Sequence, residues 1–318
     1  NLAIDFKNGK NIPDLKGKIL TAIFSNPSLR TRLSFESGMK KLNGDVNILN
    51  SSDSWEFEYE DAVIMNGSKQ EHIKEVAKVI SRYTDLIALR KSDLMTKSSF
   101  ATVSDSWEQL KKDEGINQLA KYADRPVINM ESNMFHPCQA TSDMMTIQEK
   151  LGIFKNKKYV LTWAPHPKAL PLATPHSQML LPAIMGMDVT VACPEGFELD
   201  SDVIDLAKSR GGKVVYQHDQ KKAFQDADVV VAKSWASLKY FGKWEEESEY
   251  RKKFMNWTVD SQKMSLTNNA FFMHCLPVRR NVVVTDEVLD SKNSIVIDEA
   301  ENRMWAQMAI ITKLLEQN

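Results

Sequence analysis

The chain has 318 residues, a length that favours two domains over a single core. Hydrophobic residues make up 42% and charged residues 26%, values typical of globular proteins, which exclude disordered, collagen-like and membrane-spanning chains. The 41 basic and 42 acidic residues nearly cancel, so the net charge predicts no nucleic acid partner, and any anion site has to be local.

The cysteine content favours a reducing compartment, and we expect a cytoplasmic protein. Cys138, Cys193 and Cys275 are too few for a disulfide framework, and none of them forms a CxxC pair. The chain opens without the apolar segment of a signal peptide. Because no apolar run approaches the roughly 18 to 20 residues of a membrane helix, we expect no membrane partner.

The first part of the chain alternates between short apolar runs and helical patterns. Strands are predicted at 18–24, 85–89 and 127–130, with an amphipathic helix over 71–83 between the first two. The polar stretch 91–114 has few apolar anchors and predicts a long loop or lid.

The same alternation restarts near residue 159 and continues to the end of the chain. Predicted strands cover 159–163, 188–193, 213–216, 228–232 and 271–275, and predicted helices cover about 175–186, 200–210 and 219–226. Strands that are apolar throughout, separated by amphipathic helices, favour parallel sheets covered on both faces. We therefore predict an α/β fold of two doubly wound, Rossmann-like domains, 1–137 and 138–298, joined by helices that include 138–151.

A basic turn follows the first predicted strand. Ser28, Arg30, Thr31 and Arg32 precede a helical pattern that starts near Ser34. Backbone N–H groups at a helix start favour an anion, and guanidinium groups can clamp phosphate oxygens, so the turn predicts a phosphate cradle. A solvated basic turn with a Ser or Thr cap is the alternative.

Three further sites lie at or just after strand ends. Arg90 ends a strand, at the edge where open α/β sheets bind ligands, although a surface arginine is the alternative. In HPCQ, His136 and Gln139 can polarise a carbonyl and bind an NH2 group, or the histidine is structural. In HCLP, the proline keeps Leu276 out of helical geometry, and Cys275 is expected to contact a ligand or be buried rather than act as a nucleophile.

Sequence spacing predicts neither a metal site nor a cofactor. The six histidines form no HxxxH or HxH pair, and no cysteine–histidine cluster has zinc spacing. Walker A and GxGxxG motifs are also absent from the sequence, so nucleotide use has no support. The remaining chemistry combines an anion with a carbonyl group and needs no cofactor.

These motifs together resemble the aspartate/ornithine carbamoyltransferase family. SLRTR at 28–32, HPCQ at 136–139 and HCLP at 274–277 occur in the family's order and at its separations. VRRN after HCLP and EAENR at 299–303 narrow the resemblance to the ornithine-type branch. The resemblance covers nearly the whole chain.

The resemblance implies domain functions and an assembly. Residues 1–137 would form the carbamoyl phosphate-binding domain, and 138–298 would bind the amine substrate. The C-terminal helix 299–318 would pack back on the first domain, and the enzyme would be a homotrimer.

The resemblance also implies residue roles. Ser28, Leu29, Arg30 and Thr31 would hold the phosphate of carbamoyl phosphate, with Arg90 bridging phosphate and carbonyl oxygen. The carbamoyl group would be surrounded by His136, Gln139, Cys275, Leu276 and Arg303. Arginine, threonine and histidine donors make the carbonyl more electrophilic and stabilise its oxyanion, by about 3 to 4 kcal/mol for each well-placed donor. Arg90, His136, Gln139, Cys275 and Arg303 are thus the expected catalytic residues.

One departure from the family pattern concerns the amine substrate. Ornithine enzymes carry an Asp-x-Trp-x-Ser-Met-Gly loop whose acid meets the free α-ammonium, whereas residues 232–238 here read AKSWASL. Lys233 would repel an ammonium group but can pair with the α-carboxylate of a substrate whose α-amine is capped. This charge reversal resembles the N-acylornithine carbamoyltransferases of a variant arginine pathway. An ordinary strand-end lysine is the alternative.

Further matches to that subgroup imply contacts with the acylornithine. They are Glu131, His166, Arg279 and Trp55, the last expected to reach a neighbouring subunit's site. Gln70 stands where the subgroup has Glu in acetyl-preferring and Pro in succinyl-preferring enzymes. Since Gln has the length of Glu without its charge, we expect N-acetyl-L-ornithine as substrate, with N-succinyl-L-ornithine as the alternative.

Three other functions stay open at this stage. They are an ordinary ornithine carbamoyltransferase, a carbamoyltransferase for another amine, and a catalytically silent paralogue with a binding role. The complete set of anion donors argues against a silent copy, and VRRN argues for the ornithine-type branch.

Overall fold

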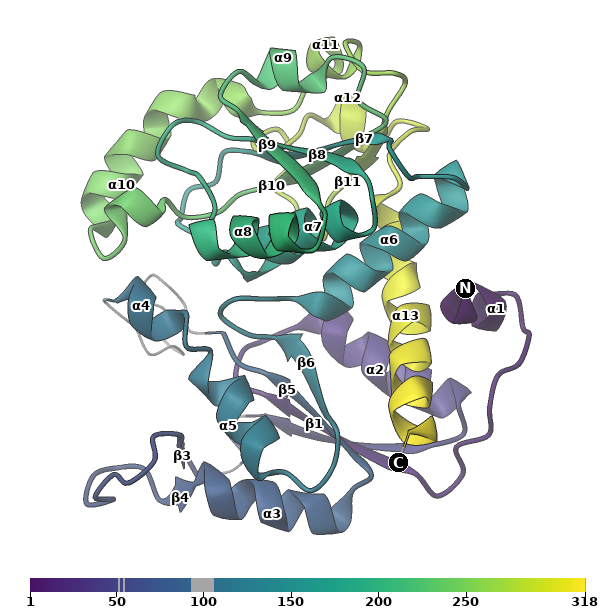
Figure 1. Cartoon of the computed structure of the whole chain (residues 1–318), viewed down its shortest axis with the longest axis vertical. Helices are drawn as coiled ribbons and strands as arrows, with labels where there is room; N and C mark the ends of the chain where they lie inside the picture. The colour runs from purple at the N-terminus through teal and green to yellow at the C-terminus, as the bar shows by residue number, and fades with distance from the viewer. Residues whose placement is uncertain (51, 54, 93–105, 318) are drawn as a thin grey trace. The chain divides into compact units, whose positions relative to one another are not determined.

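The computed structural model describes residues 1–318 apart from 51, 54, 93–105 and 318. The chain forms two compact α/β units (Figure 1). The first unit consists of Asn1–Asp93, Glu108–Cys138 and Arg303–Asn318, and the second is built mainly from Gln139–Asn302. The chain passes between the units within helices α6 (Pro137–Leu151) and α13 (Val296–Glu316).

The first unit contains a parallel sheet with the strand order β2-β1-β5-β6. Its strands are β1 (Ile19–Phe24), β2 (Asp45–Asn50), β5 (Leu86–Arg90) and β6 (Val127–Glu131). Successive side chains of β1 point to opposite faces, as in any strand. Leu20, Ala22 and Phe24 pack on one face with α2 (Leu29–Lys41), and Ile23 packs on the other with α3 (Ile73–Tyr83) and α5 (Glu114–Tyr122).

Smaller elements complete this unit. They are α1 (Leu2–Lys7), the short strands β3 (Phe57–Glu58) and β4 (Glu71–His72), and part of α4 (Trp107–Leu110). Met308 and Ile311 of α13 pack with Phe6 of α1 in the same core cluster as α2. The last helix therefore contributes directly to the core of the first unit.

The second unit contains a five-stranded parallel sheet with the order β11-β10-β7-β8-β9. The strands are β7 (Lys158–Trp163), β8 (Asp188–Ala192), β9 (Lys213–Gln217), β10 (Val229–Lys233) and β11 (Phe271–Met273). Helices α7 (Ala173–Ile184) and α8 (Ser201–Ser209) cover one face, and α9 (Gln220–Phe224) and α11 (Ser261–Met264) lie on the other (Figure 1). The remaining elements are η1 (Leu238–Tyr240), α10 (Trp244–Arg251), η2 (Lys252–Trp257) and α12 (Asp286–Leu289).

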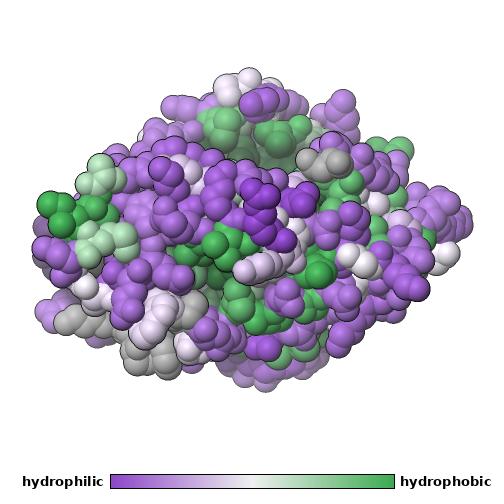
Figure 2. Space-filling model, turned by 90° about the horizontal axis from the view of Figure 1, so that it is seen from below, coloured by the Kyte–Doolittle hydropathy of each residue, from purple (hydrophilic) through white to green (hydrophobic). Residues whose placement is uncertain are grey.

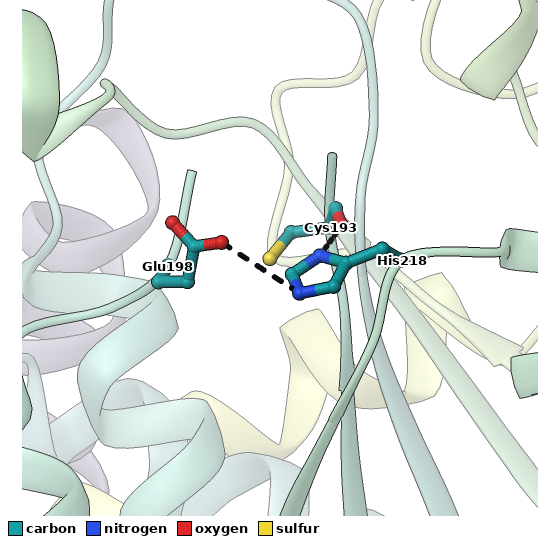
Figure 3. Close-up of side chains that lie close together, drawn as sticks. All are labelled: Cys193, Glu198 and His218. Carbon is teal, nitrogen blue, oxygen red and sulfur yellow. Dashed lines mark hydrogen bonds and ion pairs between the residues drawn. The ribbon is translucent and has the colours of Figure 1, made fainter. Parts of the chain in front are cut away.

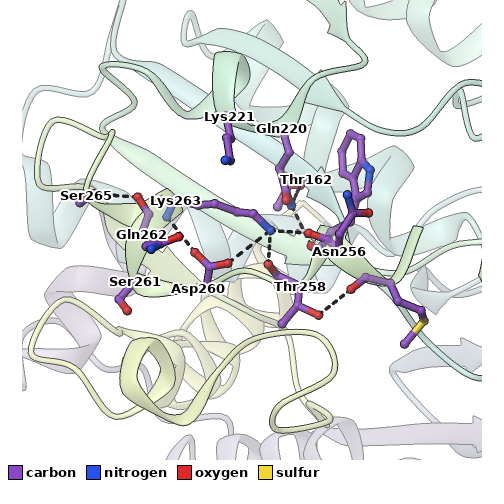
Figure 4. A network of polar contacts seen from close by, with 12 residues as sticks. Thr162, Gln220, Lys221, Asn256, Thr258, Asp260, Ser261, Gln262, Lys263 and Ser265 are labelled. Carbon is purple, nitrogen blue, oxygen red and sulfur yellow. Dashed lines mark hydrogen bonds and ion pairs between the residues drawn. The ribbon is translucent and has the colours of Figure 1, made fainter. Parts of the chain in front are cut away.

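A largely buried lysine fixes the segment between η2 and α11 (Figure 4). Lys263 Nζ donates to the backbone carbonyls of Asn256 and Thr258 at 2.5 Å each and lies 3.5 Å from Asp260 Oδ2. Burial lowers the pKa of Lys263, whereas Asp260 opposes that shift. The lysine thus donates to carbonyl groups at the end of η2 and just after it.

The predicted fold class is confirmed, because both sheets are parallel and carry helices on two faces. The prediction missed β2 and placed the start of α2 near Ser34 rather than at Leu29. The predicted loop over 91–114 lies mostly outside the described residues, and its last part forms α4. None of the described helices combines the length and the apolar character needed to cross a membrane.

Candidate functional site

The first half of the candidate site is the start of α2, directly after the carboxyl end of β1. Ser28 is the N-cap, with an extended backbone, and its Oγ accepts the Thr31 N–H at 3.3 Å. The first N–H groups of a helix have no acceptor within the helix, and α2 carries no acid in its first turn. The predicted turn of Ser28, Leu29, Arg30 and Thr31 is therefore a helix start suited to an anion.

Two arginines from distant parts of the chain meet at this helix start. Arg303 Nη2 donates to Thr31 Oγ1 at 2.8 Å, and Arg90 Nη1 lies 3.4 Å from the same oxygen. Thr31 and Arg303 are almost fully buried, with 1% and 2% of their surface exposed. The structure thus brings together three of the residues predicted to bind carbamoyl phosphate within one unit, and the positive charge of the two arginines favours a phosphate there.

Glu131 and His136 adjoin the two arginines. Arg90 forms a salt bridge with Glu131, whose Oε2 lies 3.6 Å from His136 Nε2. The ladder between β5 and β6 shifts register next to Arg90, an irregularity that can redirect side chains at a strand end. Glu131 was expected to contact the amine substrate. In this structure it is paired with Arg90, a residue expected to bind carbamoyl phosphate.

The second unit holds Gln139 between two buried carboxyl groups. Its Nε2 donates to Asp143 Oδ1 at 2.7 Å and to Glu299 Oε1 at 3.0 Å. Gln178 donates to Asp143 at 2.9 Å, and the backbone N–H of His274 donates to Glu299 at 2.9 Å. Since the amide nitrogen of Gln139 serves these carboxyl groups, its carbonyl oxygen is the atom suited to accept from a substrate NH2 group.

The sequence did not indicate Asp143 and Glu299 as site residues. The spacing of Asp143, one helical turn after Gln139, was the available signal. Burial, followed by the charge of Asp143, raises the pKa of Glu299 well above its usual value. Burial and the neighbouring Asp143 carboxyl group therefore favour the protonated form of Glu299, whose hydroxyl can donate to Asp143. This arrangement keeps two carboxyl groups side by side without two buried negative charges.

Replacing Glu299 by Gln is expected to leave the free energy of unfolding close to that of the wild type near pH 5. At higher pH the variant should become more stable than the wild type. A Glu that stays protonated when folded but ionises when unfolded binds more protons in the folded state, so wild-type stability falls as pH rises through this window. The slope reaches about 1.4 kcal/mol per pH unit. Urea unfolding of both proteins from pH 5 to 8 measures the difference, and parallel curves would contradict it.

The HCLP segment adopts an unusual backbone at Leu276. Leu276 has a φ of +52°, in the left-handed region, and its peptide bond to Pro277 is cis. Its N–H donates to the ring Nδ1 of His274 at 2.9 Å. The sequence predicted a non-helical Leu276 before proline but not this left-handed conformation, which the histidine ring supports. Cys275, between them, is partly exposed.

A cationic cluster forms at the carboxyl edge of the second sheet. Arg279 Nε donates to His166 Nε2 at 3.0 Å, and His166 Nδ1 lies 2.9 Å from the carbonyl of Lys168. Burial, helped by the nearby charges of Arg279 and Lys233, lowers the pKa of His166 to about 4. The histidine is therefore neutral at pH 7. These three predicted residues form a site suited to a carboxylate.

A buried ion pair supports the loop that follows Lys233. Arg251 donates to Ser234 Oγ at 2.9 Å and to the carbonyl of Trp235 at 3.0 Å, and it pairs with Glu247. Arg251 and Glu247 are 3% and 1% exposed. In the sequence, the signal for this pair is its i,i+4 spacing within a highly charged helix, which does not distinguish it from a solvated pair.

Trp55 and Gln70 lie in the segment around β3 and β4, and both are exposed. Trp55 is 61% exposed, and the nearby Ile64 is 80% exposed. An apolar patch lies at the left edge of Figure 2, where the β3–β4 segment projects in Figure 1. The segment around β3 and β4 therefore carries large apolar side chains that are exposed to solvent, Trp55 and Ile64 among them.

A helix start with arginines in one α/β unit, and a cluster suited to a carboxylate in the other, are features suited to an enzyme with a phosphorylated donor and an anionic acceptor. The comparison with known families agrees. Residues 1–149 match the aspartate/ornithine carbamoyltransferase carbamoyl-P binding domain, and residues 173–314 match the Asp/Orn binding domain. The chain therefore belongs to the aspartate/ornithine carbamoyltransferase family.

Individual relatives differ in their amine substrates. The chain is 44% identical to the N-acetylornithine carbamoyltransferase of Xanthomonas campestris pv. campestris, over 98% of this chain and 92% of the relative. It is 39% identical to the N-succinylornithine carbamoyltransferase of Bacteroides thetaiotaomicron, over 95% of this chain and 88% of that relative. A crystal structure of acetylornithine transcarbamylase complexed with acetylcitrulline is similar, with a TM-score of 0.92 at 43% identity, covering 98% of this chain and 93% of that one.

Proposed function

We propose that this enzyme transfers the carbamoyl group of carbamoyl phosphate to the δ-amine of N-acetyl-L-ornithine, giving N-acetyl-L-citrulline and phosphate. The observation that carries the proposal is the cluster of Lys233, Arg279 and neutral His166. A free α-ammonium would be repelled by these two cations, whereas an acylated α-nitrogen carries no charge. The α-carboxylate of the acylated substrate then supplies the anion that the cluster favours.

The roles of the donor residues follow from the first half-site. The start of α2, with Ser28, Leu29, Arg30 and Thr31, would bind the phosphate, and Arg90 would bridge phosphate and carbonyl oxygen. Arg303 and Arg90 both contact Thr31 Oγ1, which supports stabilisation of negative charge at this helix start. Arg90, His136 and Arg303 would stabilise the oxyanion, and Gln139, Cys275 and Leu276 would hold the carbamoyl NH2 side.

The chemical step needs no cofactor. The neutral δ-amine attacks the carbonyl carbon, forming a C–N bond and a tetrahedral oxyanion. The C–O bond to phosphate then breaks, the carbonyl re-forms, and the proton lost by the amine passes to the departing phosphate. Proximity of the two bound substrates supplies much of the acceleration, because it replaces a bimolecular encounter.

Two observations support acetyl as the acyl group of the substrate: the residue at position 70 and the sequence identities to relatives. Gln70 has the length of Glu and fills space that a succinyl chain would need, although it lacks the charge that would repel the succinyl carboxylate. The higher identity to the N-acetylornithine enzyme supports the same choice. Glu131 and Trp55 would complete the acceptor site.

The assembly we propose is a cytoplasmic homotrimer, acting in arginine biosynthesis, in which the β3–β4 segment of each subunit reaches the neighbouring site. The exposure of Trp55 and of the apolar run Val63, Ile64 and Met65 supports this, because exposed large apolar side chains are costly in water and typical of an interface. The cysteine content, three residues with no CxxC pair, supports a reducing compartment.

The function is tested by measuring ureido product from carbamoyl phosphate with ornithine, N-acetylornithine and N-succinylornithine side by side. We expect N-acetylornithine to give the highest kcat/KM, and free ornithine to give little or no product. Preference for N-succinylornithine would overturn the acetyl assignment alone. Turnover of free ornithine only would contradict the role of Lys233, and no turnover of any amine would contradict the proposed reaction.

A further inference from the structure

The carboxyl ends of β8 and β9 hold a second cluster of chemically active side chains, outside the site proposed above. Cys193, Glu198 and His218 point toward one another (Figure 3). One ligand atom of each, the cysteine sulfur, a carboxylate oxygen and a ring nitrogen, lies within 4.8 Å of the other two. Sulfur, nitrogen and oxygen donors of this kind are the ligands of zinc in proteins.

The parallel sheet itself brings two of these residues together. Ala192 pairs with Gln217 at the end of the ladder, and the Cys193 N–H donates to the Gln217 carbonyl at 3.2 Å. Cys193 and His218 are the next residues of the two strands, although 25 positions separate them in the chain. Spacing rules for metal sites detect only local pairs, which explains why the sequence predicted no metal site.

The orientation of His218 suits metal binding. Its Nδ1 lies 2.9 Å from the backbone carbonyl of Cys193, and a carbonyl oxygen can only accept, so Nδ1 carries the proton in the neutral ring. Metal-binding histidines usually donate their second N–H to a carbonyl or carboxylate in this way. The Nε2 lone pair then faces Glu198 Oε1 at 3.7 Å, and a cation between these two acceptors would be favourable.

Glu198 is held in place by its surrounding loop. Its carboxylate accepts the Gly196 N–H at 2.9 Å, and Gly196 has a φ of +85° that favours glycine. Trp235 Nε1 donates to the Phe197 carbonyl at 2.7 Å, and the Leu199 N–H lies 3.1 Å from the Tyr216 hydroxyl. These contacts fix the loop before any ion binds, which lowers the ordering cost of binding.

We propose that Cys193, Glu198 and His218 bind a zinc-class divalent cation, with a water molecule in the fourth position. Zinc–ligand bonds of about 2.0 to 2.3 Å place tetrahedral ligands about 3.3 to 3.6 Å apart. The 3.7 Å between Nε2 and Oε1 is already near this range, and the sulfur has to move by about 1.2 to 1.5 Å at most. Cys193 is buried, while His218 and Glu198 are 39% and 40% exposed, so the ion can enter from the solvent side.

A bound cation would also affect the loop after Lys233. The loop that carries Glu198 contacts that segment through Trp235 and through Ser237, whose Oγ donates to the Gly196 carbonyl. Tying the ends of β8 and β9 to this loop would stabilise the second unit, because an ion that binds only the folded state raises stability.

The test uses the full chain freed of metal with a chelator and titrated with Zn²⁺ against a chromophoric competitor. We expect one ion per chain, a higher midpoint temperature of unfolding with Zn²⁺, and a sulfur-to-cobalt charge-transfer band when Co²⁺ replaces Zn²⁺. Cys193→Ser and His218→Gln should each weaken binding by about 10-fold or more. His72→Gln and Cys138→Ala serve as matched controls and should bind like the wild type.

Three outcomes would overturn the proposal. The first is that the chain binds no Zn²⁺, which is the result expected if His218 and Glu198 form only an ion pair with each other. The second is binding that is unchanged in Cys193→Ser and His218→Gln, which would locate the ion elsewhere. The third is Co²⁺ binding without the thiolate band. Circular dichroism of the metal-free variants shows whether they fold, and Glu198→Gln provides a third ligand test that leaves the buried Cys193 unchanged.

Discussion

Replacing Arg90 by Met is expected to lower kcat/KM by about 100- to 1,000-fold, the loss typical of one oxyanion donor. Arg90 lies beside Thr31 at the start of α2 and pairs with Glu131. Removing its guanidinium group therefore takes away a donor that the transition state needs more than the ground state does. Steady-state kinetics with carbamoyl phosphate as the varied substrate measures the effect.

The control for Arg90 is Arg82→Met, which removes an exposed arginine from α3 in the same unit. It should retain wild-type kinetics. Because Arg90→Met leaves Glu131 without its partner, the double variant with Glu131→Gln separates lost catalysis from lost stability. A kcat/KM within a few-fold of wild type in a folded Arg90→Met protein would contradict the assigned role.

Replacing Arg251 by Met is expected to destabilise the protein by about 3 to 5 kcal/mol, the cost of breaking a buried ion pair. Glu247 would keep its charge in a buried position, and Ser234 and Trp235 would lose their donor. The loop that carries Lys233 should loosen as well, which predicts a higher KM for the acylornithine. Denaturant unfolding and steady-state kinetics measure the two effects.

Two further variants make the Arg251 prediction specific. The double variant Arg251→Met with Glu247→Gln should recover much of the lost stability, since no buried charge remains. Lys252→Met removes the adjacent cation, which lies on the surface, and should change stability by less than about 1 kcal/mol. If Arg251→Met and Lys252→Met lower the free energy of unfolding equally, the buried ion pair stabilises the protein no more than a surface pair does.

The parts of the fold that the sequence predicts well are the buried strands. Runs such as VVVA and YVLTW are almost entirely apolar because both faces of a parallel strand are covered. β2 escaped prediction because it is an edge strand whose residues are exposed or only partly buried, with Asp45, Asn47 and Asn50 interrupting the apolar pattern. The start of α2 was placed too late because Leu29 and Leu33 are 69% and 51% exposed, so its first turn shows no apolar face.

The candidate site could be predicted where a motif carries it. The helix start at Ser28 and the charge reversal at Lys233 are visible in the sequence, and the structure places Arg90 and Arg303 on Thr31. The buried pair of Arg251 and Glu247 could not be predicted, because a helix reading WEEESEYR resembles a solvated one. Arg251 turns inward because Trp163 and Phe197 stack against its guanidinium group, at 5.4 and 5.3 Å, and no local pattern encodes that contact.

The most direct test of the central claim is the ratio of kcat/KM for N-acetylornithine to that for ornithine, measured in wild type, Lys233→Met and the exposed control Lys239→Met. We expect the wild type and Lys239→Met to favour N-acetylornithine strongly. In Lys233→Met the ratio should fall by about 10- to 100-fold, the value of one charged hydrogen bond. A ratio unchanged in Lys233→Met, or a wild type that favours free ornithine, would contradict the role of Lys233 in selecting an acylated substrate.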